Sequence, residues 1–242
     1  MKYCLPLLFI FLSGNLLAQK TQKITREFPN SGIKEVYEVL RSDTAIKNGS
    51  YKYQGARFAT TGWYKNSQKD SVWICYGFGR ISARGSYKNG KRDGIWDIYN
   101  YNNELETQYD FTANKIVFHK SDSRNDTVKY AVITGKDTAY TRLNMPPMYG
   151  GGEAQIAGLL VSAIRYPAQA KETNTTGKVI IAVTIDENGH AINYRIKKYV
   201  KNGLAEEALR VIRLLDDNWL PAYLNNKAVA AEYDIPVNFS LG

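Results

Sequence analysis

Gly177-Lys-Val-Ile-Ile-Ala-Val-Thr-Ile-Asp186 is the stretch that decides how the carboxyl-terminal part of this 242-residue chain folds. Its β-branched residues are typical of a strand, and Asp186-Glu-Asn-Gly189 is typical of a turn. Residues 191–200 then complete a hairpin, and residues 228–239 form a last strand. No motif of a catalytic centre occurs in this stretch, and its pattern indicates a surface that holds a partner.

Two helices are predicted beside this hairpin. In residues 153–165 the apolar side chains recur at spacings of three and four, and Tyr166-Pro167 ends the helix because proline disfavours helical geometry in the preceding residue. The second helix carries one apolar stripe, made of Leu204, Ala208, Val211, Ile212 and Leu215. Trp219, which follows the second helix, is predicted to be a core residue.

The basic charge is concentrated in the first half of the chain. Residues 20–142 contain 21 Lys and Arg against 13 Asp and Glu, whereas residues 143–242 contain ten of each kind. A chain of this length with 44% hydrophobic residues can bury a core. The uneven charge favours two domains over one.

The first residues are typical of a secretory signal. Lys2 precedes an apolar run over residues 3–12, residues 13–15 interrupt it, and residues 16–18 are apolar or small, as a signal peptidase requires. We predict that residues 1–18 are cleaved and that the protein lies in the periplasm or cell envelope. The alternative is an uncleaved inner-membrane anchor, for which the run is shorter than the usual span of about 20 residues.

A repeat with an offset of 23 residues lies in the first half. Gly62-Trp-Tyr-Lys-Asn66 with Trp73 returns as Gly85-Ser-Tyr-Lys-Asn89 with Trp96. The Asn-Gly pair at 89–90 favours a tight turn, so each unit is predicted to be a β-hairpin. One hairpin cannot bury its aromatic face alone, so the units should stack edge to edge with Trp and Tyr in the core. An aromatic platform for a ligand is the alternative.

Basic residues outnumber acidic ones by ten to two within residues 47–93. A solvated strand face explains part of this excess, and an anionic partner, such as a lipid head group or an envelope polymer, would explain the rest. The predicted signal disfavours nucleic acid as that partner. The candidate anion-binding residues are Lys65, Lys69, Arg84, Lys88, Lys91 and Arg92.

The sequence lacks the motifs of an enzyme or a metal site. His119 and His190 have no Cys or carboxylate at metal-ligand spacing, and neither a nucleophile elbow nor a phosphate loop is present. We predict no catalytic residue, no metal and no cofactor. Cys75, the one cysteine outside the predicted signal, is predicted to be a buried apolar residue.

Residues 85–99, Gly85-Ser-Tyr-Lys-Asn-Gly-Lys-Arg-Asp-Gly-Ile-Trp-Asp-Ile-Tyr99, resemble the MORN-type repeat of bacterial envelope proteins. The likeness covers residues 39–115. Such repeats bind no uniform partner, so the resemblance implies an architecture of hairpins and no specific ligand.

A stronger resemblance covers residues 147–241. Six motifs occur in the order of the TonB carboxyl-terminal domain: Pro147-Met-Tyr-Gly-Gly, Tyr166-Pro-Ala-Gln-Ala, residues 177–186 with Gly189, Glu207-Ala-Leu-Arg-Val-Ile212, Trp219-Leu-Pro-Ala222 and Pro236-Val-Asn-Phe239. The resemblance implies a small α+β fold, in which a three-stranded antiparallel sheet has helices on one face.

The same resemblance implies that a peptide of an outer-membrane transporter, or of another envelope protein, adds to the exposed last strand. The sequence supports this independently, because a terminal strand is expected at a sheet edge, where backbone groups are unpaired. Pro236 limits pairing at its own position. An edge that is capped by Lys227 and Glu232 and binds nothing, and a homodimer through this edge, are alternatives. The implied peptide-binding residues are Ala228, Val229, Ala230, Ala231, Glu232, Tyr233, Asp234, Ile235 and Val237, with Arg165 and Tyr166 near the same site.

The chain also departs from the resemblance. A force-transducing TonB keeps an uncleaved membrane helix and a Pro-rich span, whereas this chain has a predicted signal and basic repeats. We therefore predict a non-enzymatic envelope protein, with an anchored energy transducer as the alternative. The predicted divisions are a signal (1–18), an all-β repeat domain of stacked hairpins (20–118), a linker with one strand (119–142) and the TonB-like domain (143–242).

Overall fold

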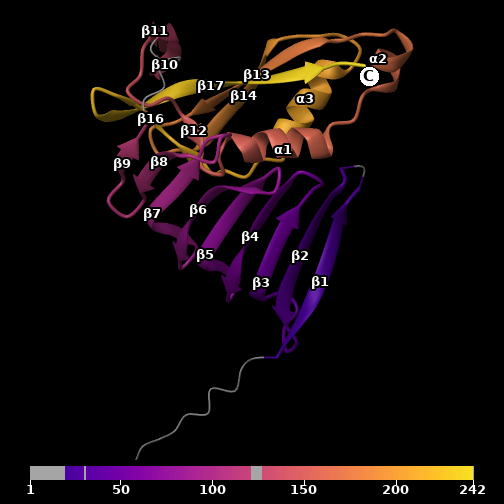
Figure 1. The fold of residues 1–242 in the computed structure, drawn as a ribbon, viewed down its shortest axis with the longest axis vertical. Coiled ribbons are helices and arrows are strands. Elements are labelled where there is room, and N and C mark those ends of the chain that lie inside the picture. Colours follow the sequence, from indigo (N-terminus) through magenta and orange to yellow (C-terminus); the bar gives the residue numbers. More distant parts are fainter. Residues whose placement is uncertain (1–19, 30, 121–126, 242) are drawn as a thin grey trace, which may run out of the picture.

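The computed structural model describes residues 20–29, 31–120 and 127–241, which are mostly β-structure with three helices (Figure 1). The first part is one antiparallel sheet whose nine strands pair in chain order. The predicted array of hairpins is therefore present, while its identity as MORN-type repeats stays a prediction. The strands are β1 (Thr21–Phe28), β2 (Ile33–Leu40), β3 (Lys47–Gln54), β4 (Phe58–Lys65), β5 (Gln68–Gly77), β6 (Arg80–Lys88), β7 (Lys91–Tyr99), β8 (Leu105–Asp110) and β9 (Lys115–His119).

The 23-residue repeat builds the inner face of this sheet. Trp73 and Trp96 are each only 1% exposed. A Cβ added at Gly62 would lie 2.2 Å from the Trp73 ring, and a Cβ added at Gly85 would lie 2.2 Å from the Trp96 ring. Each indole therefore lies flat on a glycine of the preceding strand. The Tyr87 ring sits between them, with centroids 5.4 and 5.3 Å from the two Trp rings, so the aromatic residues form a continuous core layer.

The carboxyl-terminal sheet has six strands, in the order β11-β10-β17-β13-β14 with β16 also paired to β17. The expected three strands were too few. Residues 130–141, expected as a linker with one strand, form the hairpin β10–β11 and extend the sheet because Ala131 and Val132 are buried beside β17. The strands are β10 (Tyr130–Thr134), β11 (Asp137–Thr141), β13 (Gly177–Ile185), β14 (Ala191–Lys198), β16 (Ala222–Leu224) and β17 (Lys227–Phe239), and a separate pair is formed by β12 (Met148–Tyr149) and β15 (Trp219–Leu220).

The helices lie between the two sheets. Helix α1 (Glu153–Ala163) crosses one end of the nine strands (Figure 1), and α3 (Leu204–Ile212) packs on β13 and β14 as its apolar stripe predicts. The short α2 (Ala168–Glu172) follows α1. Two glycines allow α1 to approach the sheet closely: a Cβ at Gly77 would lie 2.2 Å from the Ala154 carbonyl oxygen, and a Cβ at Gly158 would lie 2.3 Å from that of Arg57.

Two apolar clusters hold the sheets together, and each takes residues from both parts of the chain. In the first, Ile33 and Phe58 join α1, α3, β13 and β17. In the second, Cys75, Ala83, Ile98 and Tyr109 pack against Met145, Met148, Leu220 and Tyr223. The division into separate domains stays a prediction, since neither sheet has a core of its own in these clusters.

Cys75 is a buried residue, as predicted, and its burial raises the pKa of the thiol to about 12. Trp219 is fully buried, which confirms the prediction for it. The predicted signal, residues 1–18, lies outside the described residues. Among the residues that are described, no helix has the length and apolarity to cross a membrane.

Replacing Gly62 with alanine tests the stacking of Trp73 on the backbone. We expect Gly62→Ala to lower the free energy of unfolding by about 1–3 kcal/mol, because the new methyl group overlaps the indole. Urea unfolding followed by Trp fluorescence measures this. In a protein that already carries Trp73→Leu, the Gly62→Ala substitution should lower the free energy of unfolding by less, because the indole is gone. If the two substitutions have strictly additive effects on the free energy of unfolding, the contact is contradicted.

Candidate functional site

The last strand, β17, is an edge over only part of its length. Its residues from Ala231 to Phe239 pair with β13 on one side. On the side away from β13, β10 pairs with Ala230 and Ala231. Nearer its start, β17 pairs with β16 through Lys227, Ala228 and Val229. The expectation of an edge exposed from residue 228 is therefore wrong for Ala230 and Ala231. Beyond Ala231, no strand of the described chain pairs with this side of β17.

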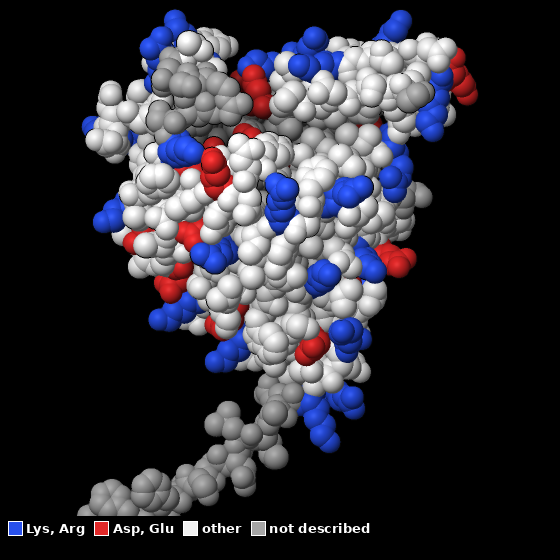
Figure 2. Space-filling view, viewed as in Figure 1, with Lys and Arg blue, Asp and Glu red and all other residues white. Residues whose placement is uncertain are grey.

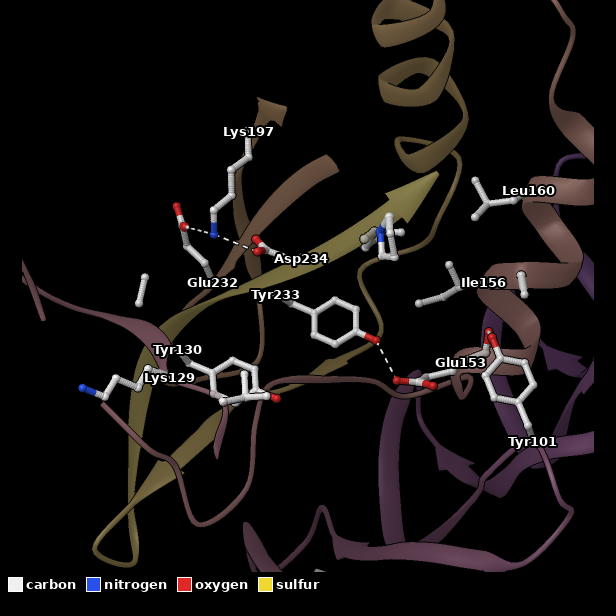
Figure 3. A pocket seen from close by; sticks show the side chains of 15 residues that line it. Tyr101, Lys129, Tyr130, Glu153, Ile156, Leu160, Lys197, Glu232, Tyr233 and Asp234 are labelled. Carbon is white, nitrogen blue, oxygen red and sulfur yellow. Dashed lines mark hydrogen bonds and ion pairs between the residues drawn. The ribbon is translucent and has the colours of Figure 1, made fainter. Parts of the chain in front are cut away.

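A groove of about 410 Å³ follows the free part of this edge (Figure 3). The lining from β17 runs from Glu232 to Pro236, and α1 supplies Ile156 and Leu160 opposite. Ile156 and Ile235 are buried, so the floor of the groove on the helix side is apolar. Further lining comes from Tyr101 and from residues 128–131, which lead into β10.

A hydrogen bond fixes β17 against the first turn of α1. The Tyr233 hydroxyl donates to Glu153 Oε1 at 3.0 Å, and the Tyr101 hydroxyl donates to the Glu153 carbonyl oxygen at 3.2 Å. Burial, reinforced by the Glu153 carboxylate, raises the pKa of Tyr233 well above its usual value, so this phenol keeps its proton. The bond sets the distance between the strand edge and the helix, and hence the width of the groove.

On the opposite face of the sheet, side chains of β17 form ion pairs with side chains of β14. Arg195 on β14 forms two hydrogen bonds to the Glu232 carboxylate, at 2.8 and 2.7 Å, and Lys197 Nζ lies 2.7 Å from Asp234 Oδ2. Glu232 is a buried carboxylate, so its bidentate partner compensates the cost of its burial. The acidic side chains of the edge are thus already neutralised by the protein itself.

Arg165 and Tyr166 are placed differently from each other. The Tyr166 ring packs against Phe239 at the end of β17, with ring centroids 5.8 Å apart, and its hydroxyl donates to the Thr175 carbonyl oxygen. Arg165 lies beside Gly32 in the turn between β1 and β2, where its guanidinium contacts carbonyl oxygens. The structure therefore places Tyr166 against the end of β17, outside the lining of the groove, and Arg165 against the nine-stranded sheet.

The six predicted anion-binding residues fall into two groups, three with a partner for their charge and three without an ion pair to a described residue. Lys69 lies over the Trp73 ring, with Nζ 4.7 Å from the centroid, Arg92 lies 4.2 Å over the Phe111 ring, and Arg84 pairs with Asp97 at 3.0 Å. The charged groups of these three residues therefore already interact with the protein itself. The other three, Lys65, Lys88 and Lys91, are exposed beside the turns of the β4–β5 and β6–β7 hairpins and form no ion pair with a described residue. Figure 2 shows Lys and Arg spread over the visible face without a single dense patch.

The two histidines lie apart in the fold. His119 contacts the Thr107 hydroxyl at 2.9 Å, and burial lowers its pKa, whereas His190 contacts Asp217 at 2.7 Å on the surface. Within the described ranges no group of three or more His, Cys, Asp or Glu residues could hold a metal ion.

The groove contains residues that the sequence did not identify. Glu153, Ile156, Leu160 and Lys197 line it, yet only the apolar spacing of the first helix marked two of them, as core residues. A helical period shows which side chains share a face and not which strand that face meets. Tyr101 carried no signal, and residues 128–131 were marked only as part of the linker with one strand.

Residues 162–241 match the family model of the Gram-negative bacterial TonB protein C-terminal, which confirms the predicted domain over about a third of the chain. The matched family is a protein-interaction domain and not an enzyme. No curated protein matches the chain. Among solved structures, the chain is similar to a mutant of S. aureus TarM in complex with Fondaparinux, alpha-GlcNAc-glycerol and UDP, at 12% identity and a TM-score of 0.22, over 40% of this chain and 21% of that one.

Two buried phenols of the nine-stranded sheet give the protein a measurable alkaline transition. Burial, with smaller contributions from Asp216 and Glu35, raises the pKa of Tyr53 and Tyr64 from 10.0 to about 12. A raised pKa means that the folded state holds the proton more tightly. The resulting stabilisation is complete below pH 10 and is lost as the pH rises to about 12.

We therefore expect the unfolding free energy to fall over this pH range, and to fall less in Tyr53→Phe and Tyr64→Phe. Phenolate absorbance against pH, together with urea unfolding at each pH, measures both effects. Tyr140→Phe, at an exposed position, is the control and should not alter the profile. Normal titration of Tyr53 and Tyr64 near pH 10 would contradict the assignment.

Proposed function

We propose that this envelope protein binds an extended peptide of an outer-membrane transporter or another envelope protein, which adds as a strand to β17. The observation that carries the proposal is the stretch of β17 from Glu232 to Phe239. It pairs with β13 on one side, and its other side pairs with no described strand and is bordered by the groove. Unpaired backbone groups along a strand edge are the usual template for strand addition.

The chain itself supplies a precedent for such pairing. Its own strand β10 pairs antiparallel to β17, with Val132 opposite Ala231 and Ile133 opposite Ala230. A peptide that continues in the line of β10 would face up to eight residues of β17, a length of about 26 Å. Pro236 removes one donor from that ladder, because proline has no N–H.

Side chains of an added strand alternate between the two sides of the sheet. Those that face α1 would meet Ile156, Leu160 and Ile235, so small or branched apolar residues suit them. Those on the opposite side would meet the Arg195–Glu232 and Lys197–Asp234 pairs, which suit polar residues. The peptide expected from this groove is therefore one of alternating apolar and polar residues.

We also propose that the exposed lysines of the hairpin turns dock the protein to an anionic component of the envelope. Lys65, Lys88 and Lys91 support this, since they are exposed beside the turns of two successive repeats and form no ion pair with a described residue. Lys69, Arg84 and Arg92, which the sequence also suggested, are left out because the protein uses their charges internally.

Peptide titration of residues 20–242 tests strand addition. Both sheets are kept because the apolar clusters that they share would be opened by removing either one. With amino-terminal segments of outer-membrane transporters as the peptides, we expect amide shifts in residues 232–239. Leu160→Glu should weaken binding by roughly tenfold or more, because it places a charge in the apolar wall of the groove.

Val161→Glu is the matched control, since Val161 is the next residue of α1, is exposed and does not line the groove. It should bind as tightly as the unaltered protein. Amide shifts that spare residues 232–239, or equal affinities of the two glutamate variants, would refute the proposal.

Reversing the three turn lysines together tests the docking surface. Lys65→Glu/Lys88→Glu/Lys91→Glu should weaken binding to phosphatidylglycerol vesicles by roughly 100-fold, at about 1 kcal/mol for each basic residue near an anionic surface. Cosedimentation at low and high salt measures this. The same reversal at Lys171, Lys178 and Lys201, exposed lysines of the TonB-like part, gives an equal change in net charge. An equal loss in both variants would show attraction by net charge alone.

A further inference from the structure

A second cavity, of about 210 Å³, lies between the aromatic face of the nine-stranded sheet and the segment that follows α3. Its lining shares no residue with the groove along β17. It is therefore a separate feature of the molecule, and the strand-addition proposal makes no use of it.

Aromatic rings form the wall of this cavity on the side of the sheet. Tyr53 packs against Phe58 with ring centroids 5.5 Å apart, and Tyr51 packs against Tyr64 and Trp73 at 5.2 Å each. Each ring is held by the edge or face of another. The wall is consequently fixed before any ligand arrives, which lowers the entropic cost of binding.

Charged groups of opposite sign stand at the mouth of the cavity. Lys69 Nζ lies 3.7 Å from Asp216 Oδ2, beyond hydrogen-bond distance, and the Asp216 side chain is 52% exposed. The second carboxylate oxygen of Asp216 accepts a hydrogen bond from the Tyr149 hydroxyl. The Lys69 ammonium can therefore donate a hydrogen bond to a ligand, and the neighbouring Asp216 carboxylate can accept one.

Neutral polar groups lie further in. Gln155 is only 4% exposed and its Nε2 donates to the Thr60 hydroxyl at 2.6 Å, but its Oε1 has no hydrogen-bond partner among the described residues. The hydroxyls of Tyr53 and Tyr64 likewise make no hydrogen bond to the described part of the chain. The two phenols can therefore bond to a ligand, whereas Gln155 Oε1 lies against Gly151 and is closed to the cavity.

This combination of groups restricts the chemistry of a ligand. A simple anion would face the Asp216 carboxylate, and a simple cation would face the Lys69 ammonium. An apolar molecule would leave the phenols of Tyr53 and Tyr64 unpaired. Hydroxyl groups both donate and accept, so a ring that bears several of them can satisfy donors and acceptors on all sides while its C–H face lies on the aromatic wall.

We propose that this cavity binds one neutral sugar ring of pyranose size. The volume, which is below the usual range of about 300–1,000 Å³ for ligand pockets, admits a single ring. Asp216 and Lys69 bind adjacent hydroxyls at the mouth, and the Tyr64 and Tyr53 phenols contact the ring edge. Through the half-exposed mouth, the remainder of a longer glycan would extend into solvent.

Saturation-transfer NMR with the methyl glycosides of glucose, galactose and N-acetylglucosamine tests this on residues 20–242. We expect transfer to the ring protons of at least one glycoside at millimolar concentration, with a change in Trp fluorescence on the same titration. Tyr64→Phe removes one hydroxyl and keeps the ring, and Asp216→Asn removes one charge and keeps the size. Each should weaken binding by roughly fivefold or more.

Two controls separate this site from the rest of the molecule. Tyr140→Phe, at an exposed tyrosine, should bind the glycoside normally, and so should Leu160→Glu, which alters only the peptide groove. Absence of transfer from all three glycosides to the unaltered protein would overturn the proposal, with water alone filling the cavity. So would unchanged affinity in both Tyr64→Phe and Asp216→Asn, or tighter binding of phenol or of free glycine than of every glycoside.

Discussion

The nine-stranded sheet depends on burial of one of its faces, which it cannot achieve by itself. A single antiparallel layer places one face on a core and leaves the other in water. Here Trp73 and Trp96 lie on glycines of the inner face, and Met145 and Leu220 from the second half of the chain complete the cover. The two parts of the protein therefore stabilise each other, and the free energy of folding is shared across their contact.

This packing also determines where a peptide could bind. Helix α1 approaches the nine-stranded sheet closely, because neither Gly77 at the end of β5 nor Gly158 on the helix has a side chain. This contact fixes the helix on the sheet. The bond from Tyr233 to Glu153 then fixes β17 relative to that helix. The groove along β17 is thus held by the first half of the chain, although every strand of the sheet that it borders comes from the second half.

Local patterns in the sequence predicted many of the elements, and they did so for a physical reason. Alternation and β-branching predicted β13 and β14, a single apolar stripe predicted α3, and the offset of 23 residues predicted hairpins with buried indoles. All of these depend on side chains within one strand, helix or hairpin. The predicted edge failed at Ala230 and Ala231 because β10, which lies about 100 residues earlier in the chain, pairs there.

By itself, the sequence determined many of the elements, the matched region over residues 162–241 and the burial of Trp73, Trp96 and Cys75, because side-chain periodicity records which face of an element avoids water. Trp63, which the repeat also suggested for the core, is 48% exposed. The tertiary structure alone decided which part of β17 is free, which lysines are unengaged and where the two cavities lie. Strand pairing uses backbone groups that every residue carries, so no pattern of side chains encodes the partner of a distant strand. Contacts such as Tyr233 with Glu153 arise only once the two parts of the chain have packed together.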